Sequence, residues 1–299
     1  LCALYGVPVQ ALPQVYMSDG VFGTTDLGGF LGRAVPVCGV LGDSHGALLG
    51  QGCFAPGTAK ATYGTGSSVM MQTGDACIES TGGLVTSLAW GLSGRVNYVL
   101  EGNLNYTGAV ISWLKKDVGL LDSDAESEQL ARQAHPGDRT YFVPAFTGLG
   151  APYWDSEATG LLTGITRTTG KAEIVRACLD CIAYQITDLL ECMGRDAALP
   201  LAELRVDGGA SVSDILMQIQ ADLLRLPVDR PAQVETTAFG AAALAGLAVG
   251  VWNGFDELAA LRRSQCVFRP QREEEACLAD LARWHRAVER SRSWIENNV

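Results

Sequence analysis

The stretch LRVDGGASVSDILMQIQADLL, residues 204–224, predicts a strand, a turn and a helix in immediate succession. Leu204 to Val206 form the short strand, and the double glycine that follows ends it. The helix is predicted from about Ser213 to Leu224. A short strand near Val228 comes next, followed by a helix rich in Ala and Gly. This strand–helix–strand–helix order predicts an α/β fold.

The chain before this stretch predicts strands first and helices later. Five apolar or alternating runs are separated by Gly, Ser and Asp turns, as in strands joined largely by hairpins. These runs are Val35–Leu41, Ala59–Tyr63, Ser67–Thr73, Leu84–Trp90 and Arg95–Leu100. Residues 105–120 fit a helical period, and a further helix carries an apolar residue every four positions at Ile174, Cys178, Ile182 and Ile186. We therefore predict a mixed five-stranded sheet with helices on both faces.

Other segments are predicted from their turn residues and charges. Residues 1–33 are punctuated by Gly, Pro and Asp and are mostly loop, and residues 121–139 are acidic and polar, which favours a surface loop or a short helix. PAFTGLGAPYWD, residues 144–155, is predicted to be an ordered loop with aromatic anchors. The last helix is predicted from Glu273 to about Asn297, with acids in its first turn and arginines later, as the helix macrodipole favours.

The composition excludes several classes of protein. The chain has 299 residues, 47% hydrophobic and 18% charged, so it can bury enough apolar surface to fold. Its formal net charge of −11 repels polyphosphates at long range, which argues against nucleic acid as a partner. The longest uncharged apolar run, Ala238–Trp252, has 15 residues, whereas a membrane span needs about 20. We therefore expect neither nucleic acid nor a membrane as a partner.

Cysteine usage indicates a reducing compartment. Nine cysteines are scattered unevenly through the chain, and no secretion signal opens it, so we predict a cytoplasmic protein. Cys178 and Cys181 lie inside a predicted helix without a second pair or a histidine at ligand spacing, so no metal-ligating residue is predicted. The chain begins at Leu1 in what resembles a helix-to-turn passage, without an initiator Met. We expect it to be a fragment of a longer protein.

Asp43 is the first candidate for chemistry. It follows an apolar strand that ends at Gly42, and a carboxylate at a strand end in a cleft can accept a hydroxyl proton or hold a cation. Asp43 also precedes a helical run, where it would serve as an N-cap. A Ser/His/Asp triad with His45 is disfavoured because residues so close along a chain do not converge in space.

Two glycine turns are candidates for holding phosphate or nucleotide. Tyr63-Gly64-Thr65-Gly66-Ser67 lies between two predicted strands and can direct backbone N–H groups and a hydroxyl at one concave spot. An ordinary hairpin turn explains it equally well. Asp207-Gly208-Gly209 lies between a strand and a helix, whose first N–H groups favour anions or polar nucleotide edges. A plain strand-to-helix turn is the alternative there. Neither stretch matches the Rossmann fingerprint or the Walker A sequence.

Taken in order, these segments resemble the C-terminal half of the FGGY carbohydrate kinases, and most closely their glycerol kinase branch. The likeness covers nearly the whole chain. It rests on GDSHGAL at 42–48, KATYGTGSS at 60–68, EGNLNYTGAVISWL at 101–114, VPAFTGLGAPYWD at 143–155, VDGGASVSDILMQIQADLL at 206–224 and ETTAFGAAALAGLA at 235–248. The resemblance implies the ribonuclease H-like actin/sugar-kinase fold. It also implies an enzyme that transfers the γ-phosphoryl group of ATP, with Mg²⁺, to a hydroxyl of a small polyol or sugar.

The resemblance also implies roles for individual residues. Asp43 falls on the family's catalytic base, which takes the proton of the attacking hydroxyl. The nucleotide contacts fall on the first glycine turn, on a helix start and on the second glycine turn: Gly64, Thr65, Gly66, Gly108, Ser112, Gly209, Ala210 and Ser213. Residues 1–45 resemble the end of the family's N-terminal, sugar-binding domain, and residues 46–299 its nucleotide-binding C-terminal domain. The complete polypeptide would then be the enzyme, and this chain alone inactive or nearly so.

Departures from the family pattern concern mainly the substrate. Ser44 stands where glycerol kinases usually have Gln, and Ser68 where they have Phe. Small hydroxylic side chains at both places, contacting the acceptor, would make room for a longer polyol or a ketose. Ser112 replaces a usual Gln and Ser213 a usual Asn, which weakens only the contacts to the edge of the nucleotide base.

Other readings of the same residues stay open at this stage. One is a non-catalytic, actin-like nucleotide-binding or regulatory module, for which a base at Asp43 would be unnecessary. Another is a hydrolase using Asp43 and His45, which requires both side chains to face one cleft. The sequence leaves the acceptor open among glycerol, longer polyols and ketoses, and it leaves open a homodimer or homotetramer.

Overall fold

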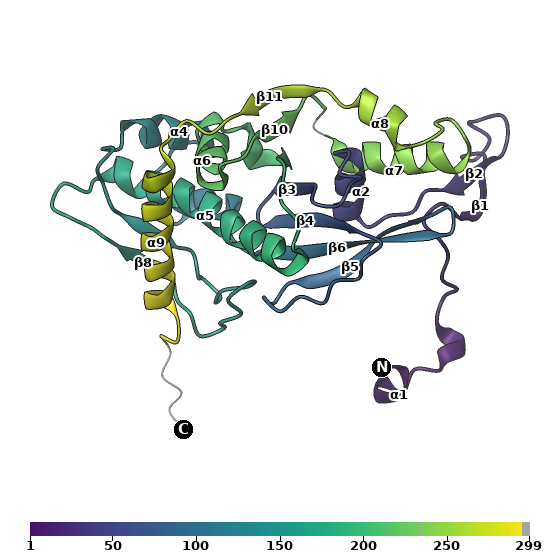
Figure 1. The fold of residues 1–299 in the computed structure, drawn as a ribbon, viewed down its shortest axis with the longest axis horizontal. Coiled ribbons are helices and arrows are strands. Elements are labelled where there is room, and N and C mark those ends of the chain that lie inside the picture. The colour runs from purple at the N-terminus through teal and green to yellow at the C-terminus, as the bar shows by residue number, and fades with distance from the viewer. Residues whose placement is uncertain (234, 295–299) are drawn as a thin grey trace.

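A seven-stranded mixed sheet lies at the centre of the part of the chain that the structure describes, residues 1–233 and 235–294 of a computed structural model (Figure 1). In spatial order its strands are β11 (Ser264–Phe268), β10 (Val228–Pro231), β9 (Leu204–Asp207), β3 (Ala59–Tyr63), β4 (Ser67–Gly74), β6 (Arg95–Leu104) and β5 (Val85–Leu92). Strand β9 pairs in parallel with β3 and with β10, and the other neighbours are antiparallel.

The prediction of five strands is wrong, although the mixed character of the sheet is confirmed. Strand β11 was missed because it is an edge strand whose side chains are mostly exposed, so its sequence, SQCVF, lacks an apolar alternation. The predicted strand over Val35–Leu41 is shorter, as β2 (Val35–Cys38), and it pairs only with β1 (Val21–Thr25) in a separate ribbon. A further two-stranded ribbon joins β7 (Tyr141–Val143) to β8 (Leu161–Thr163).

Helices cover both faces of the main sheet, as predicted. One face packs on α2 (Asp43–Gly50), α7 (Thr236–Ala248) and α8 (Phe255–Leu261). The other face packs on α3 (Gly108–Lys116), α5 (Lys171–Ala197), α6 (Asp214–Leu224) and α9 (Glu274–Ser291), with α4 (Asp124–Gln133) alongside α5. Neighbouring residues of β4 point to opposite sides, so Met70 belongs to the first core and Met71 to the second.

The long helix α5 contributes many of the residues of the larger core. Cys178, Ile182 and Ile186 of the predicted four-residue repeat are completely buried, and Ile174 is half-buried. Glu173 accepts the N–H of Gly170 at 2.9 Å and so closes the first turn. The helix therefore forms where the period predicted it, because one continuous apolar stripe faces the sheet.

The first 45 residues contribute little to either core. They contain α1 (Cys2–Tyr5), the 3₁₀ turn η1 (Val9–Ala11) and the β1–β2 ribbon, and the first buried residue of the chain is Gly46. Figure 1 shows this segment running away from the sheet toward the N-terminus. Its large apolar side chains are exposed, among them Leu1, Val15 and Phe30.

The Ala/Gly helix forms as predicted, and the last helix is shorter than predicted. The Ala/Gly helix α7 is buried along one face only, at residues such as Gly240, Ala243 and Leu244, while Ala238 and Ala242 are exposed. Helix α9 ends at Ser291 rather than near Asn297, and residues 295–297 of that prediction lie outside the described residues. No helix among the described residues is long and apolar enough to span a membrane.

Candidate active site

Asp43 is the first residue of α2, and its carboxylate is exposed. The N-cap position belongs to Gly42, so the alternative that Asp43 is the N-cap is wrong. Its Oδ1 accepts the N–H of Ser44 at 2.7 Å. The strand before it ends earlier than predicted, at Cys38. The carboxylate is thus held at the start of a helix, next to its own backbone.

Helix α2 is held against α7 by unusually close backbone contact. A Cβ on Gly240 would lie 1.8 Å from the carbonyl oxygen of Gly46, and one on Gly50 would lie 2.0 Å from that of Thr236. Only glycine fits at such positions. The small residues of α7 therefore permit this close packing, and the partner of α7 is the helix that begins with Asp43.

His45 does not pair with Asp43. Its Nε2 lies 3.2 Å from Ser87 Oγ on β5, and Ser87 in turn donates to Glu101 on β6 at 3.4 Å. Burial lowers the pKa of His45, although the charge of Glu101 opposes this, so the imidazole is neutral near pH 7. This geometry argues against the hydrolase that would use both side chains together.

Lys60 is a site residue that the sequence analysis missed. The side chain is completely buried in β3, and its Nζ donates to Ser68 Oγ at 3.2 Å and to Thr62 Oγ1 at 3.1 Å. Burial lowers the pKa of Lys60, while the charges of nearby carboxylates, including Asp43, raise it. A lysine in the middle of the strand run AKATY was the available signal, because a charge is rarely placed at a buried strand position without a partner.

The first glycine turn is held on the start of α3 by its own backbone. The N–H of Gly64 donates to Gly66 O at 2.9 Å, and the N–H of Gly108 donates to Gly64 O at 3.0 Å. A Cβ on Gly108 would lie 2.6 Å from Gly64 O, and one on Gly66 would lie 2.3 Å from Leu104 O. These glycines therefore permit close approach of hairpin and helix, and the amides of Gly64 and Gly108 are already used inside the protein.

The second glycine turn, which includes η2 (Gly209–Val212), lies against the end of β3. Gly208 has φ +87°, and a Cβ on it would lie 2.6 Å from Tyr63 O, so glycine is required there. A Cβ on Gly209 would meet no atom within 4 Å, so the backbone there is open to a ligand. Ser213 caps α6 by accepting the N–H of Leu216 at 3.4 Å, at the predicted helix start.

These turns and helix α3 line one cavity of about 610 Å³. Seven of the eight residues predicted to contact nucleotide line it: Gly64, Thr65, Gly108, Ser112, Gly209, Ala210 and Ser213. Gly66 is not in the lining. The cavity also has apolar walls from Ile111, Leu179 and Leu216, and two cations, Lys115 and Lys116. The sequence analysis did not assign these additional residues to a site, because only the tertiary fold brings α3 and α5 to the glycine turns.

Among the described residues no group of three or more His, Cys, Asp and Glu side chains lies close enough together to hold a metal ion. The predicted acceptor residues Asp43, Ser44 and Ser68 do not line the large cavity. Asp43, Ser44 and His45 form the start of α2, and Ser68, near the start of β4, accepts a hydrogen bond from the buried Lys60 of β3. His45 lies close enough to Asp43 and Lys60 for both charges to affect its pKa. The site therefore has two parts, a nucleotide-sized cavity and an open polar surface around Asp43.

Comparison with known proteins agrees with the motifs. The model of the FGGY family of carbohydrate kinases, C-terminal domain, matches residues 59–249. A glycerol kinase of Aromatoleum aromaticum is 52% identical over 295 residues, covering 99% of this chain and 59% of the relative. A glycerol kinase of Carboxydothermus hydrogenoformans is 48% identical over 294 residues, covering 98% of this chain and 59% of the relative. The chain thus spans about three fifths of the length of the curated relatives it matches.

Solved structures show the same architecture. The crystal structure of Plasmodium falciparum glycerol kinase with ADP superposes with a TM-score of 0.90 at 32% identity, covering 99% of this chain and 59% of that one. A ligand-bound xylulose kinase from Lactobacillus acidophilus superposes with a TM-score of 0.81 at 19% identity, covering 97% and 58%. The latter similarity concerns the fold alone. The predicted sugar-kinase fold is confirmed.

Proposed function

This chain belongs to the FGGY family of carbohydrate kinases, and from that premise we propose that its protein transfers the γ-phosphoryl group of ATP to a hydroxyl of a small polyol or sugar. The observation that carries the proposal is the cavity of about 610 Å³, in which the glycine turns and α3 converge. Phosphoryl transfer depends mainly on positioning and on neutralising charge, so a nucleotide cavity together with a carboxylate that can accept a proton is the expected apparatus.

ATP is proposed to occupy this cavity. Its apolar walls suit an adenine ring, and the open backbone at Gly209 lets the chain approach the adenosine closely. Thr65 and the hairpin that carries it are proposed to meet the phosphates, and Gly108 and Ser112 to contact the nucleotide from the start of α3. Gly66 is retained as part of this hairpin. Lys116, which is exposed in the lining, adds a positive charge to an otherwise acidic protein.

Asp43 is proposed to act as the general base. As the acceptor hydroxyl attacks, its oxygen bonds to the γ-phosphorus, the bond from that phosphorus to the bridging oxygen breaks, and ADP leaves. The hydroxyl proton passes to the carboxylate of Asp43. The proposal is supported by the free, exposed carboxylate at the start of α2, which has no cation paired to it among the described residues.

The acceptor is proposed to be glycerol or a longer polyol or ketose. The relatives named above are glycerol kinases, which supports a three-carbon acceptor. Ser44 and Ser68 support a larger acceptor, because both side chains are small. The hydroxyl oxygen of Ser68 accepts a hydrogen bond from Lys60. Hydroxylic side chains can form hydrogen bonds with the additional hydroxyls of an acceptor longer than glycerol.

Mg²⁺ is proposed to enter with ATP, as in other phosphoryl transfers, where it neutralises charge on the phosphates. The described residues offer no cluster of acidic ligands for it. No residue of this chain is therefore assigned to the metal.

The residues before Gly46 are proposed to belong to a separate, sugar-binding domain, and residues 46–299 to the nucleotide-binding domain. Two observations support this boundary: none of the first 45 residues is buried, and the relatives extend well beyond the region that this chain matches. The proposed activity is accordingly that of the complete polypeptide.

The test is Asp43→Asn in the complete polypeptide. We expect turnover to fall by roughly 100-fold or more, because general base catalysis contributes about 10²–10⁴-fold, while the dissociation constant for ADP stays unchanged. Asp256→Asn is the matched control, since Asp256 is also an exposed carboxylate in the first turn of a helix, α8. Turnover unchanged in the Asp43 variant would refute the assignment. Nucleotide binding without any phosphorylation by the wild type would favour the non-catalytic module instead.

A further inference from the structure

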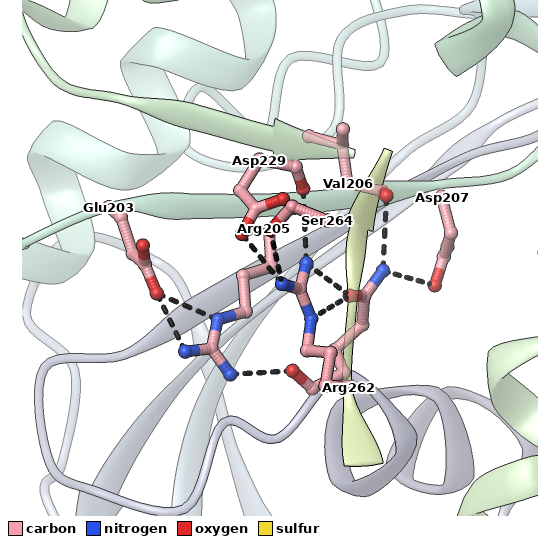
Figure 2. Close-up of polar contacts among 8 residues, drawn as sticks. Glu203, Arg205, Val206, Asp207, Asp229, Arg262 and Ser264 are labelled. Atoms are coloured by element: carbon pink, nitrogen blue, oxygen red, sulfur yellow. Dashed lines mark hydrogen bonds and ion pairs between the residues drawn. The ribbon is translucent and has the colours of Figure 1, made fainter. Parts of the chain in front are cut away.

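Gln51, directly after α2, links the helix of Asp43 to strand β9. This strand leads into the second glycine turn, here named the nucleotide turn. Its side chain is completely buried. Its Nε2 donates to the carbonyl oxygen of Val206 at 3.1 Å and to Asp207 Oδ2 at 3.0 Å, both on β9 (Figure 2). Asp207 immediately precedes Gly208 and Gly209. The amide of Gln51 therefore joins the C-terminal end of α2 to the second glycine turn.

The orientation of this amide is set by a second group of contacts. Arg262 donates through Nε and Nη2 to Gln51 Oε1, each at 3.2 Å, and its Nη1 lies 2.6 Å from Asp229 Oδ2 (Figure 2). Arg205 Nη1 donates a hydrogen bond to the backbone carbonyl oxygen of Gln51 at 2.6 Å. Because a guanidinium only donates, the oxygen of the amide must face Arg262 and its nitrogen must face Asp207.

Asp207 is tied to α7 as well. Its Oδ2 also accepts the hydroxyl of Thr236, the first residue of α7. Its Oδ1 is buried without a hydrogen-bond partner, so the carboxylate depends on Gln51 and Thr236 for its stabilisation by hydrogen bonds. Since α2 and α7 interlock through Gly46, Gly50 and Gly240, the two helices and the turn after Asp207 form one connected body.

We propose that Gln51 and Asp207 are positioning residues that set the placement of Asp43 relative to the nucleotide turn. The proposal rests on the function proposed above, and neither residue contacts the reacting atoms. Nucleotide bound at Gly209–Ser213 would contact the turn that directly follows Asp207. Asp207 in turn accepts a hydrogen bond from Gln51 at the C-terminal end of α2, and the other end of α2 carries Asp43. The placement of nucleotide and the placement of the base are thereby coupled.

The activity test compares two buried glutamines in the complete polypeptide. Gln51→Met removes the link, and Gln72→Met is the matched control. Gln72 is equally buried, but among the described residues its side chain accepts hydrogen bonds only from the backbone of Thr73 and Gly74. We expect kcat to fall by roughly 10- to 100-fold in Gln51→Met, with KM for ATP changing less than about twofold, because a misplacement of about 1 Å costs about 100-fold in rate. A lower melting temperature with unchanged kcat would overturn the proposal.

A second readout does not require turnover. In the wild type, saturating ADP should slow amide hydrogen exchange in α2 as well as around Gly209, and Gln51→Met should lose the slowing in α2 only. Thr236→Val, which removes one hydroxyl without changing shape, should weaken the same effect and serves if Gln51→Met fails to fold. Absence of slowing in wild-type α2 would overturn the coupling. Retained turnover in Asp43→Asn would instead refute the proposed function, so the two failures are distinct.

Discussion

At the scale of single residues, Ser68 is proposed to set how much room the acceptor has near Asp43. Both residues neighbour Lys60, because the Lys60 ammonium donates to Ser68 Oγ and the charge of Asp43 raises the pKa of Lys60. A bulky aromatic side chain at residue 68 would fill this space and leave Lys60 without one of its acceptors. On the proposed function, the small serine therefore leaves space for the acceptor.

Ser68→Phe should narrow the range of acceptors. In the complete polypeptide we expect kcat/KM for a five-carbon polyol to fall at least about tenfold relative to that for glycerol, since one methylene of misfit in a pocket costs about 1–3 kcal/mol. Steady-state rates with a series of polyols measure this ratio. Ser68→Ala is the control, because it removes the hydroxyl and keeps the space. An unchanged ratio in Ser68→Phe would show that residue 68 does not face the acceptor.

At the scale of elements, a buried carboxylate joins three segments on the side of the molecule that α9 covers. Asp188 of α5 accepts hydrogen bonds from Tyr153 in the loop 144–155 and from Trp284 of α9, each at 2.7 Å. His285 Nε2 lies 2.8 Å from its other oxygen. Tyr153, one of the aromatic anchors predicted for that loop, therefore also makes a polar contact. A positively charged His285 strengthens the junction between α5 and α9.

This junction should make stability depend on pH. The hydrogen bond to Asp188 raises the pKa of His285 above 6.5, so its contribution is fully present below about pH 6.5 and is lost as pH rises through the folded-state value. Thermal melts of wild type and His285→Gln across this range measure it. We expect the melting temperature of the wild type to exceed that of the variant most at acidic pH, and this difference to shrink at alkaline pH. A difference that grows with pH would contradict the assignment.

At the scale of the whole molecule, the cavity proposed for nucleotide is enclosed by this chain, whereas the proposed base, Asp43, is exposed. The cavity is formed by residues of this chain alone, from β3 to α6. Asp43 lies on an exposed surface, and phosphoryl transfer to an alcohol needs a site that keeps water away from the phosphate. Binding and catalysis should therefore separate when this chain is isolated.

The isolated 299-residue chain should bind ADP and show almost no turnover. Calorimetric titration with ADP measures the first, and a coupled assay of ADP release with ATP and a polyol measures the second. The complete polypeptide is the positive control. Robust polyol-dependent ADP release by the isolated chain would contradict the proposed division of labour between domains.

The sequence by itself determined what local chemistry and short-range pattern encode. It predicted helix α5 from its apolar spacing, the central strands from their apolar runs, and the candidate roles of Asp43 and the glycine turns from motifs. The positive φ of Gly208 is a local requirement for glycine, to which the close approach of Tyr63 O adds a tertiary one.

Only the tertiary structure decided which of these pieces meet. Strand β11 forms because β10 offers it an edge, and the glycines of α7 matter because α2 lies against them. In the sequence, Gln51 carries no signal and Lys60 only that of a charge within a strand run, yet both are completely buried and hydrogen-bonded to segments far along the chain or across the sheet. The physical reason is that burial and hydrogen-bond partners are properties of long-range packing, which a one-dimensional pattern does not contain.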